Sequence, residues 1–200
     1  GAKLDGTVEQ FLRDAKFPYA IGYGLTECSP LIAGQTKDMV FQATGHALVD
    51  MDVKLINQNE KGIGEIVCKG PNIMKGYYKD PQRTESAFTE DGYYRTKDLG
   101  KMTKDGCLSI VGRVDNMLIG PNGENIYPEE IENYILGIPY VQEVVVRGKK
   151  NEQGQEVALI AEVFLNTIST VSSPFTTSTN TLEPLKAYFR ELVKRFSKTR

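Results

Sequence analysis

The run from Tyr23 to Glu27, with the sequence YGLTE, holds the first side chains whose types can do chemistry. It directly follows a predicted strand at 17–22, and Gly24 lets a ligand approach the backbone closely. Thr26 offers a hydroxyl and a backbone N–H to a phosphate, Glu27 offers a hard oxygen to Mg²⁺, and Tyr23 offers a flat face to a base. The plainer interpretation is a turn that begins a helix, and the run taken alone favours it.

A second group consists of Asp98, which ends the run YRTKD, and Arg113, at the end of the next predicted strand. One carboxylate can accept hydrogen bonds from both hydroxyls of a ribose. Each such bond is worth ~1.5–3 kcal/mol, so Asp98 can shift nucleotide affinity about ten- to hundred-fold. Arg113 can reach the same sugar or the phosphate. The plainer interpretation is a surface ion pair between the two, worth ~0–1 kcal/mol, which the residues alone favour.

Other candidate groups carry less signal. The run Gly22-Tyr23-Gly24 lacks the third glycine of a dinucleotide fingerprint, and no GxxxxGK[ST] run occurs. His46 is isolated and is interpreted as structural, and nothing near Cys28 in sequence would activate a thiolate. Five basic residues read as the solvated face of a last helix, with a phosphate ligand or an anionic membrane as the less favoured alternative: Arg190, Lys194, Arg195, Lys198 and Arg200.

The elements that must position these residues are mostly short strands in the first half of the chain. Apolar spacing predicts a helix at 4–17 with one buried face made of Leu4, Val8, Phe11, Leu12 and Ala15. Residues 29–50 read as irregular. The remaining patterns predict two hairpins and a short helix, at 51–56 with 63–69, at 93–102 with 107–111, and at 80–88. Short strands joined by turns are typical of a small barrel.

The chain changes character between Gly112 and Glu132, where we predict a hinge. An Asn-Gly pair suits a hairpin turn at 120–123, and Pro128 begins a helix to residue 138 with Ile131, Tyr134, Ile135 and Ile138 on its apolar face. Strands at 141–147 and 157–165, a long Ser/Thr-rich mobile loop at 166–180 and a final helix from Thr181 complete a small α+β unit. We therefore divide the chain into domains at 1–114 and 115–200.

Length and composition exclude several classes of protein. The 200 residues suffice for one domain or two small ones, and a net charge of −2 gives no nucleic-acid footprint. No apolar run approaches ~18 residues, so no membrane span is predicted, and no signal peptide is seen. Three distant cysteines and one histidine argue against a zinc site and for reduced thiols in a cytosolic protein. The ends, at Gly1 and Arg200, look like cuts in a longer protein.

Read together, the motifs resemble those of the adenylate-forming superfamily, the acyl-CoA synthetases and their relatives. YGLTE resembles the adenine and phosphate motif, YRTKDL at 94–99 resembles YRTGDL, and GRVD at 112–115 resembles the hinge motif. Gly64-Glu65-Ile66 with Gly70 and Lys75-Gly76-Tyr77 resembles the GE…G…GY motif. The match runs from residue 1 to about 165. The form GPNGENIYPEEIE most resembles the long-chain fatty-acid–CoA ligase branch.

The resemblance implies roles for the first motif. Tyr23 and Gly24 would contact the nucleotide, with Tyr23 stacked on adenine. Thr26 would bind the phosphate of the adenylate and Glu27 would help to hold Mg²⁺, which makes Thr26 and Glu27 the catalytic residues of this stretch.

It also implies roles for four later residues. Asp98 would hold the ribose hydroxyls with help from Arg113. Asp115 would be the pivot about which a small domain rotates between two half-reactions. Gly123 and its loop would line the channel for the pantetheine arm of CoA.

The implied fold is α+β: the β-rich, barrel-like end of a large adenylating domain, hinged to a small truncated α+β lid. The implied enzyme joins a fatty acid to ATP with Mg²⁺, giving acyl-AMP and pyrophosphate, and CoA then displaces AMP. The expected partners are fatty acid, ATP and CoA, without nucleic acid. The expected location is the cytoplasm, with peripheral membrane contact left open. Acyl chain length and oligomeric state are not predicted.

The sequence departs from the family pattern at Lys97, which replaces the usual glycine and can pair with Asp98 or with phosphate. No lysine follows Asp115 where many relatives have one. The family's phosphate loop would lie before Gly1 and its catalytic lysine after Arg200. Loss of one such electrostatic group costs ~10²–10³ in rate, so we expect the chain to be inactive alone. Three alternatives stay open: a carrier-protein thiol as acceptor, a non-catalytic AMP-binding module, and a structural β-rich domain.

Overall fold

The computed structural model describes residues 4–37, 39–120, 123–138, 141–150 and 156–165. The chain divides into two compact units, Gly1–Phe164 and Leu165–Arg200. The predicted loop at 166–180, the predicted final helix and the five basic residues near the C-terminus lie outside the described residues. Within those residues, no helix has the length and hydropathy that a membrane crossing requires.

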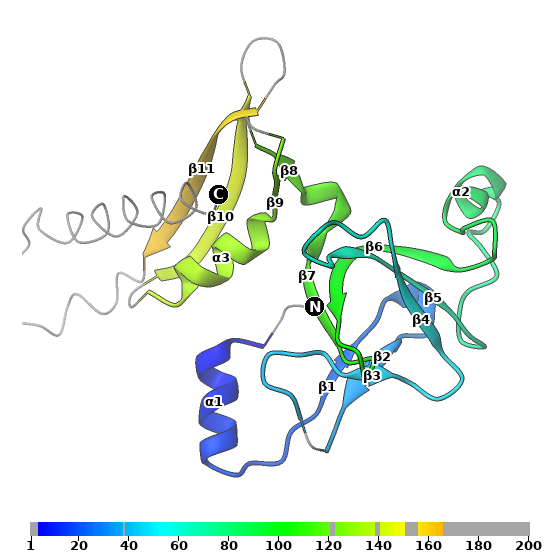
Figure 1. The fold of residues 1–200 in the computed structure, drawn as a ribbon, viewed down its shortest axis with the longest axis horizontal. Helices are drawn as coiled ribbons and strands as arrows, with labels where there is room; N and C mark the ends of the chain where they lie inside the picture. The colour runs from blue at the N-terminus through cyan, green and yellow to red at the C-terminus, as the bar shows by residue number, and fades with distance from the viewer. Residues whose placement is uncertain (1–3, 38, 121–122, 139–140, 151–155, 166–200) are drawn as a thin grey trace, which may run out of the picture. The chain divides into compact units, whose positions relative to one another are not determined.

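The centre of the first unit is an antiparallel sheet of four strands, in the order β4 (Asp52–Ile56), β5 (Gly64–Lys69), β6 (Tyr94–Met102) and β7 (Leu108–Arg113) (Figure 1). Strands adjacent in sequence pair with each other, so both predicted hairpins are confirmed. The α+β class is confirmed as well. The described strands do not close into a barrel, because β4 and β7 are the first and last strands of the four-stranded sheet and do not pair with each other.

A small sheet of three strands carries the first motif. It has the order β1 (Ile21–Tyr23), β2 (Ala33–Gln35) and β3 (His46–Ala47), and its last two strands lie in the stretch expected to be irregular. Both strands are too short to show a period in the sequence. Backbone hydrogen bonds from Thr44 and to Gly45 tie this region to Leu108 on β7, at 2.8 and 2.7 Å. The small sheet is therefore anchored to the central one.

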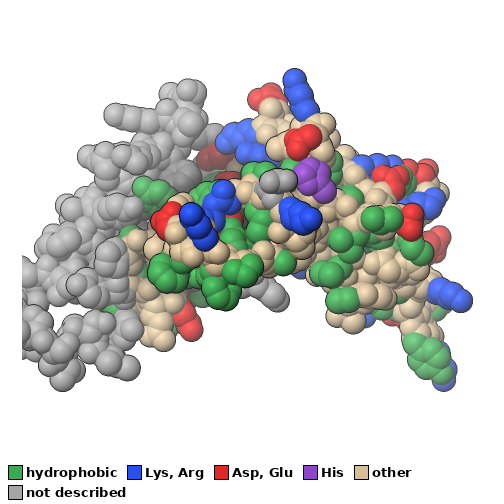
Figure 2. All heavy atoms as spheres, turned by 90° about the horizontal axis from the view of Figure 1, so that it is seen from below, with side chains coloured by type: hydrophobic (Ala, Val, Ile, Leu, Met, Phe, Trp, Pro, Cys, Tyr) green, Lys and Arg blue, Asp and Glu red, His purple; other side chains and the backbone are tan. Residues whose placement is uncertain are grey.

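Helix α1 (Gly6–Asp14) lies within the predicted range 4–17 and begins later, because the Asp5 carboxylate caps it by accepting the N–H groups of the first turn. The predicted buried face is wrong. Val8 and Phe11 are 47% and 67% exposed, whereas Glu9 is fully buried. Buried charge needs hydrogen-bond donors, and Glu9 receives them from the Tyr19 hydroxyl and from the backbone and side chain of Gln42. Figure 2 shows hydrophobic side chains at the surface on the face in view.

The main core lies between the two sheets. Its fully or nearly fully buried members are Cys28, Ile32, Ala33, Ile66, Cys68, Tyr94 and Leu108. Full burial of a side chain such as Ile66 stabilises the fold by about 1.5–3 kcal/mol. The core includes the residue that directly follows the Tyr23–Glu27 run, so packing fixes the position of this motif.

Two short turns and one short helix complete the first part of the chain. The 3-10 turns are η1 (Thr26–Cys28) and η2 (Val114–Asn116). Helix α2 (Pro81–Ser86) confirms the prediction at 80–88, with Pro81 in its first turn and the Asp80 carboxylate accepting the N–H of Arg83 at 3.0 Å.

The remaining elements follow the predicted hinge. Strands β8 (Leu118–Ile119) and β9 (Asn125–Ile126) form the predicted hairpin. Helix α3 (Pro128–Leu136) packs on β10 (Val141–Lys150), which shares a sheet with β11 (Glu156–Leu165) (Figure 1).

The apolar face predicted for α3 is only partly correct. Ile131 and Ile135 are buried, and Val144 and Val146 of β10 are buried too. Tyr134, expected on the same face, is exposed. The domain boundary predicted at residue 115 stays a prediction.

Candidate nucleotide site

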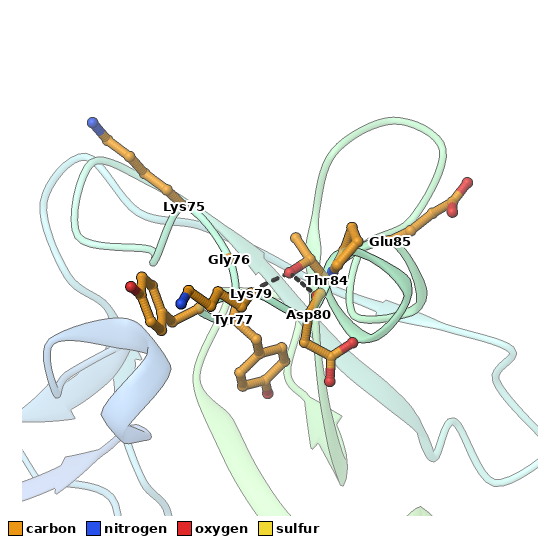
Figure 3. A pocket seen from close by; sticks show the side chains of 9 residues that line it. Lys75, Gly76, Tyr77, Lys79, Asp80, Thr84 and Glu85 are labelled. Atoms are coloured by element: carbon orange, nitrogen blue, oxygen red, sulfur yellow. Dashed lines mark hydrogen bonds between the residues drawn. The ribbon is translucent and has the colours of Figure 1, made fainter.

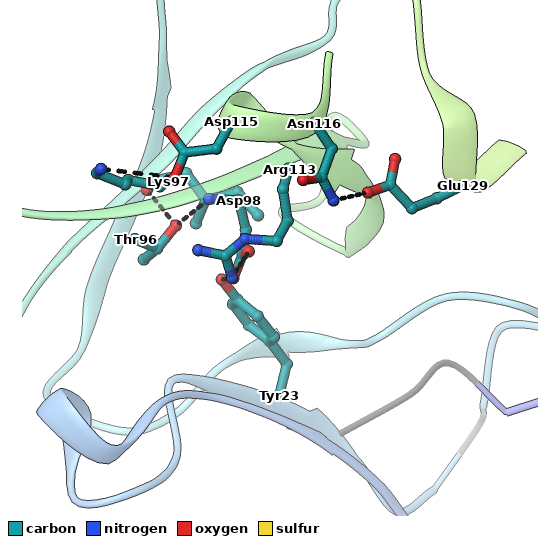
Figure 4. Close-up of polar contacts among 9 residues, drawn as sticks. Tyr23, Thr96, Lys97, Asp98, Arg113, Asp115, Asn116 and Glu129 are labelled. Atoms are coloured by element: carbon teal, nitrogen blue, oxygen red, sulfur yellow. Dashed lines mark hydrogen bonds and ion pairs between the residues drawn. The ribbon is translucent and has the colours of Figure 1, made fainter. Parts of the chain in front are cut away.

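Asp98 and Arg113 face each other across the ladder between β6 and β7. An Arg113 guanidinium nitrogen donates to Asp98 Oδ1 at 2.9 Å, so the two residues form the ion pair that the plainer interpretation describes. The pair is not a surface pair, however, because Asp98 is only 6% exposed. The Asp98 carboxylate is thus enclosed, whereas the Arg113 side chain is 44% exposed (Figure 4).

Tyr23 joins this group from the other sheet. Its hydroxyl donates to Asp98 Oδ2 at 2.7 Å, across 75 residues of sequence. Burial, followed by the nearby charge of Asp98, raises the pKa of Tyr23. The hydroxyl therefore stays protonated at neutral pH and remains a donor. The structure thus brings together the residues predicted to contact adenine and ribose.

Thr96 fixes the backbone of Asp98 and was missed from the sequence. Its hydroxyl donates to the Ile66 carbonyl at 2.8 Å and accepts the backbone N–H of Asp98 at 3.0 Å. Tyr94, Thr96 and Asp98 alternate on the buried face of β6. This spacing of two was the sequence signal that could have identified Thr96, because residues spaced two apart share a face of a strand.

The charge of Asp98 is opposed by burial, which raises the pKa of this carboxyl. The Tyr23 hydroxyl and the Arg113 guanidinium act in the opposite direction, and Glu129 adds a second negative charge nearby that raises the pKa further. The net result is a raised pKa. Burial removes water that would otherwise stabilise the Asp98 charge. A ligand that donates hydrogen bonds in place of this water would therefore interact strongly with Asp98.

The Tyr23–Glu27 run forms a turn in which Gly24 has a structural reason to be glycine. A Cβ built there would lie 1.8 Å from the Pro30 carbonyl oxygen, so the chain's own backbone fills the space. Thr26 and Glu27 lie in η1, with Thr26 exposed at the surface. The predicted ligand contact of Gly24 stays a prediction.

Glu27 is held from the next motif. The Tyr77 hydroxyl donates to Glu27 Oε1 at 3.1 Å, and the Met74 N–H donates to the Glu27 carbonyl at 2.8 Å. The described residues contain no cluster of three or more His, Cys, Asp or Glu side chains that could hold a metal. A single carboxylate fits Mg²⁺ all the same, since that ion keeps several waters and takes phosphate oxygens as further ligands.

Lys97 pairs with Asp115 rather than with Asp98. Its ammonium lies 3.5 Å from an Asp115 carboxylate oxygen, and both side chains are more than half exposed. Of the two partners expected for Lys97, Asp98 is therefore not paired with it in this structure, and phosphate stays a prediction. The backbone at Lys97 has φ +60°, in the left-handed region, which gives a physical reason for a glycine at this place in the family's pattern.

Two contacts hold α3 and the segment before it, one from η2 and one from the turn between β4 and β5. The Asn116 side-chain amide donates to Glu129 Oε1 at 2.6 Å, and Glu129 Oε2 is buried without a hydrogen-bond partner. Tyr127 is buried against Ile63 and Leu99, and its hydroxyl accepts from Asn59 at 2.9 Å. Sequence reasoning missed these contacts, because no pattern links residue 59 to residue 127.

Gly123 occupies the turn between β8 and β9 with φ +80° and donates its N–H to the Gly120 carbonyl at 2.9 Å. In the part of the chain that the structure describes, Gly123 makes no hydrogen bond to Asp98. The turn geometry explains the glycine, and the predicted contact with CoA stays a prediction.

A hollow of about 620 Å³ lies beside this site and is not the site itself. It is lined by residues between Lys75 and Glu85, with the Tyr77 N–H donating to the Thr84 hydroxyl (Figure 3). Tyr23, Asp98 and Arg113 do not line it. Tyr77 connects the two places, because its hydroxyl reaches Glu27.

Comparison with known proteins agrees with these motifs. Residues 1–78 match the family model described as AMP-binding enzyme. The chain belongs to this family. Among curated relatives of the AMP-binding family, the putative acyl-CoA synthetase YngI of Bacillus subtilis is 40% identical over 149 residues, covering 69% of this chain and 27% of YngI.

Two further relatives carry different substrate names. The 2-succinylbenzoate–CoA ligase of Enterococcus faecalis is 35% identical, over 68% of this chain and 29% of the relative. The long-chain-fatty-acid–CoA ligase 4 of Saccharomyces cerevisiae is 31% identical, over 76% of this chain and 23% of the relative. The chain thus spans about a quarter of the length of the curated AMP-binding relatives it matches.

Solved structures of the family agree with the fold. The o-succinylbenzoate CoA synthetase of Bacillus subtilis in complex with its acyl-adenylate intermediate gives a TM-score of 0.79 at 28% identity, over 96% of this chain and 38% of that one. The same synthetase with ATP and a magnesium ion gives 0.74 at 27% identity, over 92% and 38%.

Proposed function

We propose that this chain supplies part of the nucleotide site of an AMP-forming acyl-CoA ligase. In the first half-reaction a carboxylate oxygen attacks the α-phosphorus of ATP, giving acyl-AMP and pyrophosphate. In the second, the CoA thiol attacks the acyl carbon and AMP leaves. The observation that supports this best is the buried Asp98 carboxylate, held by Tyr23 and Arg113 from two different sheets.

The geometry around Asp98 suits a ribose. Each carboxylate oxygen accepts one protein donor and keeps one further acceptor position, so two sugar hydroxyls can still bind. Thr96 fixes the backbone of Asp98 before a ligand arrives, which lowers the entropy cost of binding. The bond from the Tyr23 hydroxyl fixes one end of its ring, so the ring face is preoriented for adenine.

Thr26 and Glu27 would serve the phosphate end. Thr26 is exposed on η1 and offers its hydroxyl to the phosphate, while Tyr77 holds the Glu27 carboxylate in place for Mg²⁺. Bound Mg²⁺ would neutralise charge on the phosphates and the leaving pyrophosphate. Solved relatives hold AMP in one complex and ATP with a magnesium ion in another, which supports these assignments.

For the substrate we propose a long-chain fatty acid, with CoA as the acceptor and the cytoplasm as the location. The run GPNGENIYPEEIE and the yeast relative named as a long-chain ligase support this acid. Other relatives are named for medium-chain acids, 2-succinylbenzoate and ferulate, so the acid must be identified by assay.

The hinge belongs to the same proposal. Rotation about Asp115 would present the β8–β9 turn with Gly123 to CoA in the second half-reaction. Lys97 holds Asp115 in the position seen here, and its exposed ion pair is weak enough to open, at about 0–1 kcal/mol.

The test is an assay of the longer protein that contains this chain. Pyrophosphate release should require ATP, Mg²⁺ and a carboxylic acid, and fatty acids of increasing chain length should identify the acid. The Asp98→Asn variant should lower kcat/KM by about ten- to hundred-fold, because it removes charged hydrogen bonds to the ribose. AMP binding without any pyrophosphate release would contradict the enzyme and favour a non-catalytic AMP-binding module.

A further inference from the structure

Two buried thiols face each other directly beneath the Tyr23–Glu27 turn. Cys28 Sγ and Cys68 Sγ lie 3.9 Å apart, and both residues are fully buried. Cys28 ends η1, so it is the residue that follows Glu27, whereas Cys68 lies on β5. Neither thiol has a part in the proposed function. From the sequence the two were distant cysteines, and only the fold brings them together.

We propose that Cys28 and Cys68 are an oxidation site, which hydrogen peroxide converts into a disulfide that pulls the η1 turn toward β5. The pair is identified by the contact between its two sulfur atoms and by the elements that carry them, because Cys28 lies in a short turn and Cys68 in a paired strand. This inference does not depend on the proposed ligase activity, because the disulfide is defined by chemistry within the chain.

The chemistry balances with peroxide as the only co-reactant. The sulfur of Cys28 attacks one peroxide oxygen, the O–O bond breaks, and one water leaves with the thiol proton, giving a sulfenic acid. The Cys68 sulfur then attacks the Cys28 sulfur, the S–OH bond breaks, and the hydroxide leaves as water with the Cys68 proton. Two thiols are oxidised by two electrons and one peroxide is reduced to two waters.

The geometry makes Cys28 the residue that moves. A disulfide needs a sulfur separation of about 2 Å, so the sulfur atoms must approach each other by about the same amount. Cys68 lies on a strand paired on both sides, with Val53 and with Tyr94. Cys28 lies in a single 3-10 turn that also carries Thr26 and Glu27, so closure displaces this turn.

The thiols also differ in chemical character. The hydrogen bond from the Cys68 thiol lowers the pKa of Cys28, and the same bond raises the pKa of Cys68. Cys28 is therefore the attacking sulfur and Cys68 the resolving one. Cys107 is buried as well, but burial raises the pKa of its thiol. Within the residues that the structure describes, no hydrogen bond joins it to another sulfur atom. It is the internal control.

Burial determines the product and the rate. Peroxide reaches the pair only when the η1 turn opens locally, so oxidation follows the frequency of that opening. Larger thiols cannot follow peroxide into the core, so the neighbouring Cys68 resolves the sulfenic acid. If AMP binds this turn, as proposed above, AMP should slow the oxidation.

The test treats the 200-residue chain with graded peroxide, alkylates the remaining thiols and maps the peptides. The expected result is a Cys28–Cys68 linked peptide that reductant reverses, with Cys107 still alkylated as a thiol. The Cys107→Ser variant should form the link at the wild-type rate, and Cys68→Ala should leave a trappable sulfenic acid at Cys28. Survival of both thiols, or oxidation of Cys107 as fast as the pair, would overturn the proposal.

The displacement of the turn has its own readout. Hydrogen exchange at the amides of Cys28 and Ser29, which bond to Leu25 and Thr26, should accelerate in the oxidised chain. Unchanged exchange there would overturn the coupling to the turn. A displaced site should also weaken AMP binding by about 10- to 100-fold. If neither redox state binds AMP while the linked peptide forms, the proposed function fails and the oxidation site stands.

Discussion

The buried carboxylate of Asp98 is the group on which the candidate site is centred, because Tyr23 and Arg113 both donate to it. The motifs identified the Asp98 carboxylate and the Arg113 guanidinium as candidates. The contact with Tyr23 could not be predicted, because the two residues are 75 positions apart and belong to different sheets. The role of Thr96 was not predicted for another reason. In the sequence, a threonine that packs in a strand looks the same as one that orients a neighbouring residue.

The raised pKa of Asp98 predicts a pH effect on stability. The ordinary pKa of an aspartate is about 4, and the pKa of Asp98 in the folded chain is higher. At pH values between the two, the folded chain keeps a proton that the unfolded chain has lost. The Asp98 contribution to the unfolding free energy therefore falls as the pH rises through this window. Asp98→Asn removes this group, so its stability relative to wild type should increase from about pH 4 upward.

Urea unfolding at several pH values measures this difference. Asp105→Asn is the control, because hydrogen bonding from Thr103 lowers the pKa of Asp105. The stability of this variant relative to wild type should therefore change with pH in the opposite direction. A difference between Asp98→Asn and wild type that does not change with pH would contradict the burial argument.

The left-handed backbone at Lys97 predicts a difference between two substitutions. Lys97→Gly and Lys97→Ala both remove the ion pair with Asp115, but only glycine relieves the strain at positive φ. We expect the glycine variant to be the more stable of the two by about 1 kcal/mol. Chemical denaturation of the matched pair decides this, and an alanine variant of equal or greater stability would show that the position carries no strain.

Among the elements, predictions were most accurate where a period ran for long enough to read. The strands of the central sheet and helix α3 were found within a few residues, but β2 and β3, with three and two residues, were not. Helix α1 was found with the wrong buried side. A periodic pattern shows that a face is apolar and does not show which neighbour covers it. In this structure Glu9 is buried and Phe11 is not.

Glu9 provides the prediction at the scale of an element. Glu9→Ala would leave the Tyr19 hydroxyl and two Gln42 donors without their acceptor, in partly buried surroundings. We expect a loss of about 1–3 kcal/mol in the free energy of unfolding, with α1 detaching first. The exposed Glu90→Ala should stay within about 0.5 kcal/mol of wild type. Equal effects of both variants would mean that the buried carboxylate does not anchor α1.

At the scale of the whole molecule, residues far apart in the sequence converge on one carboxylate. Two sheets, three motifs and the start of α3 surround Asp98 within a single compact unit. The buried Tyr127 packs the predicted lid segment against Ile63 and Leu99, whereas the bond from Asn116 to Glu129 lies within that segment. These contacts depend on tertiary packing, so the sequence could suggest a hinge at Asp115 but not what holds the hinge segment in place.

The measurement that tests the central claim most directly is a calorimetric titration of AMP into this chain, with Asp98→Ala and the exposed Asp105→Ala as a matched pair. If the ribose site is already formed, wild type and Asp105→Ala should bind AMP alike. Asp98→Ala should bind about ten- to hundred-fold more weakly, because it loses charged hydrogen bonds to the sugar. Measurable and equal affinity of all three chains would contradict a nucleotide site centred on Asp98.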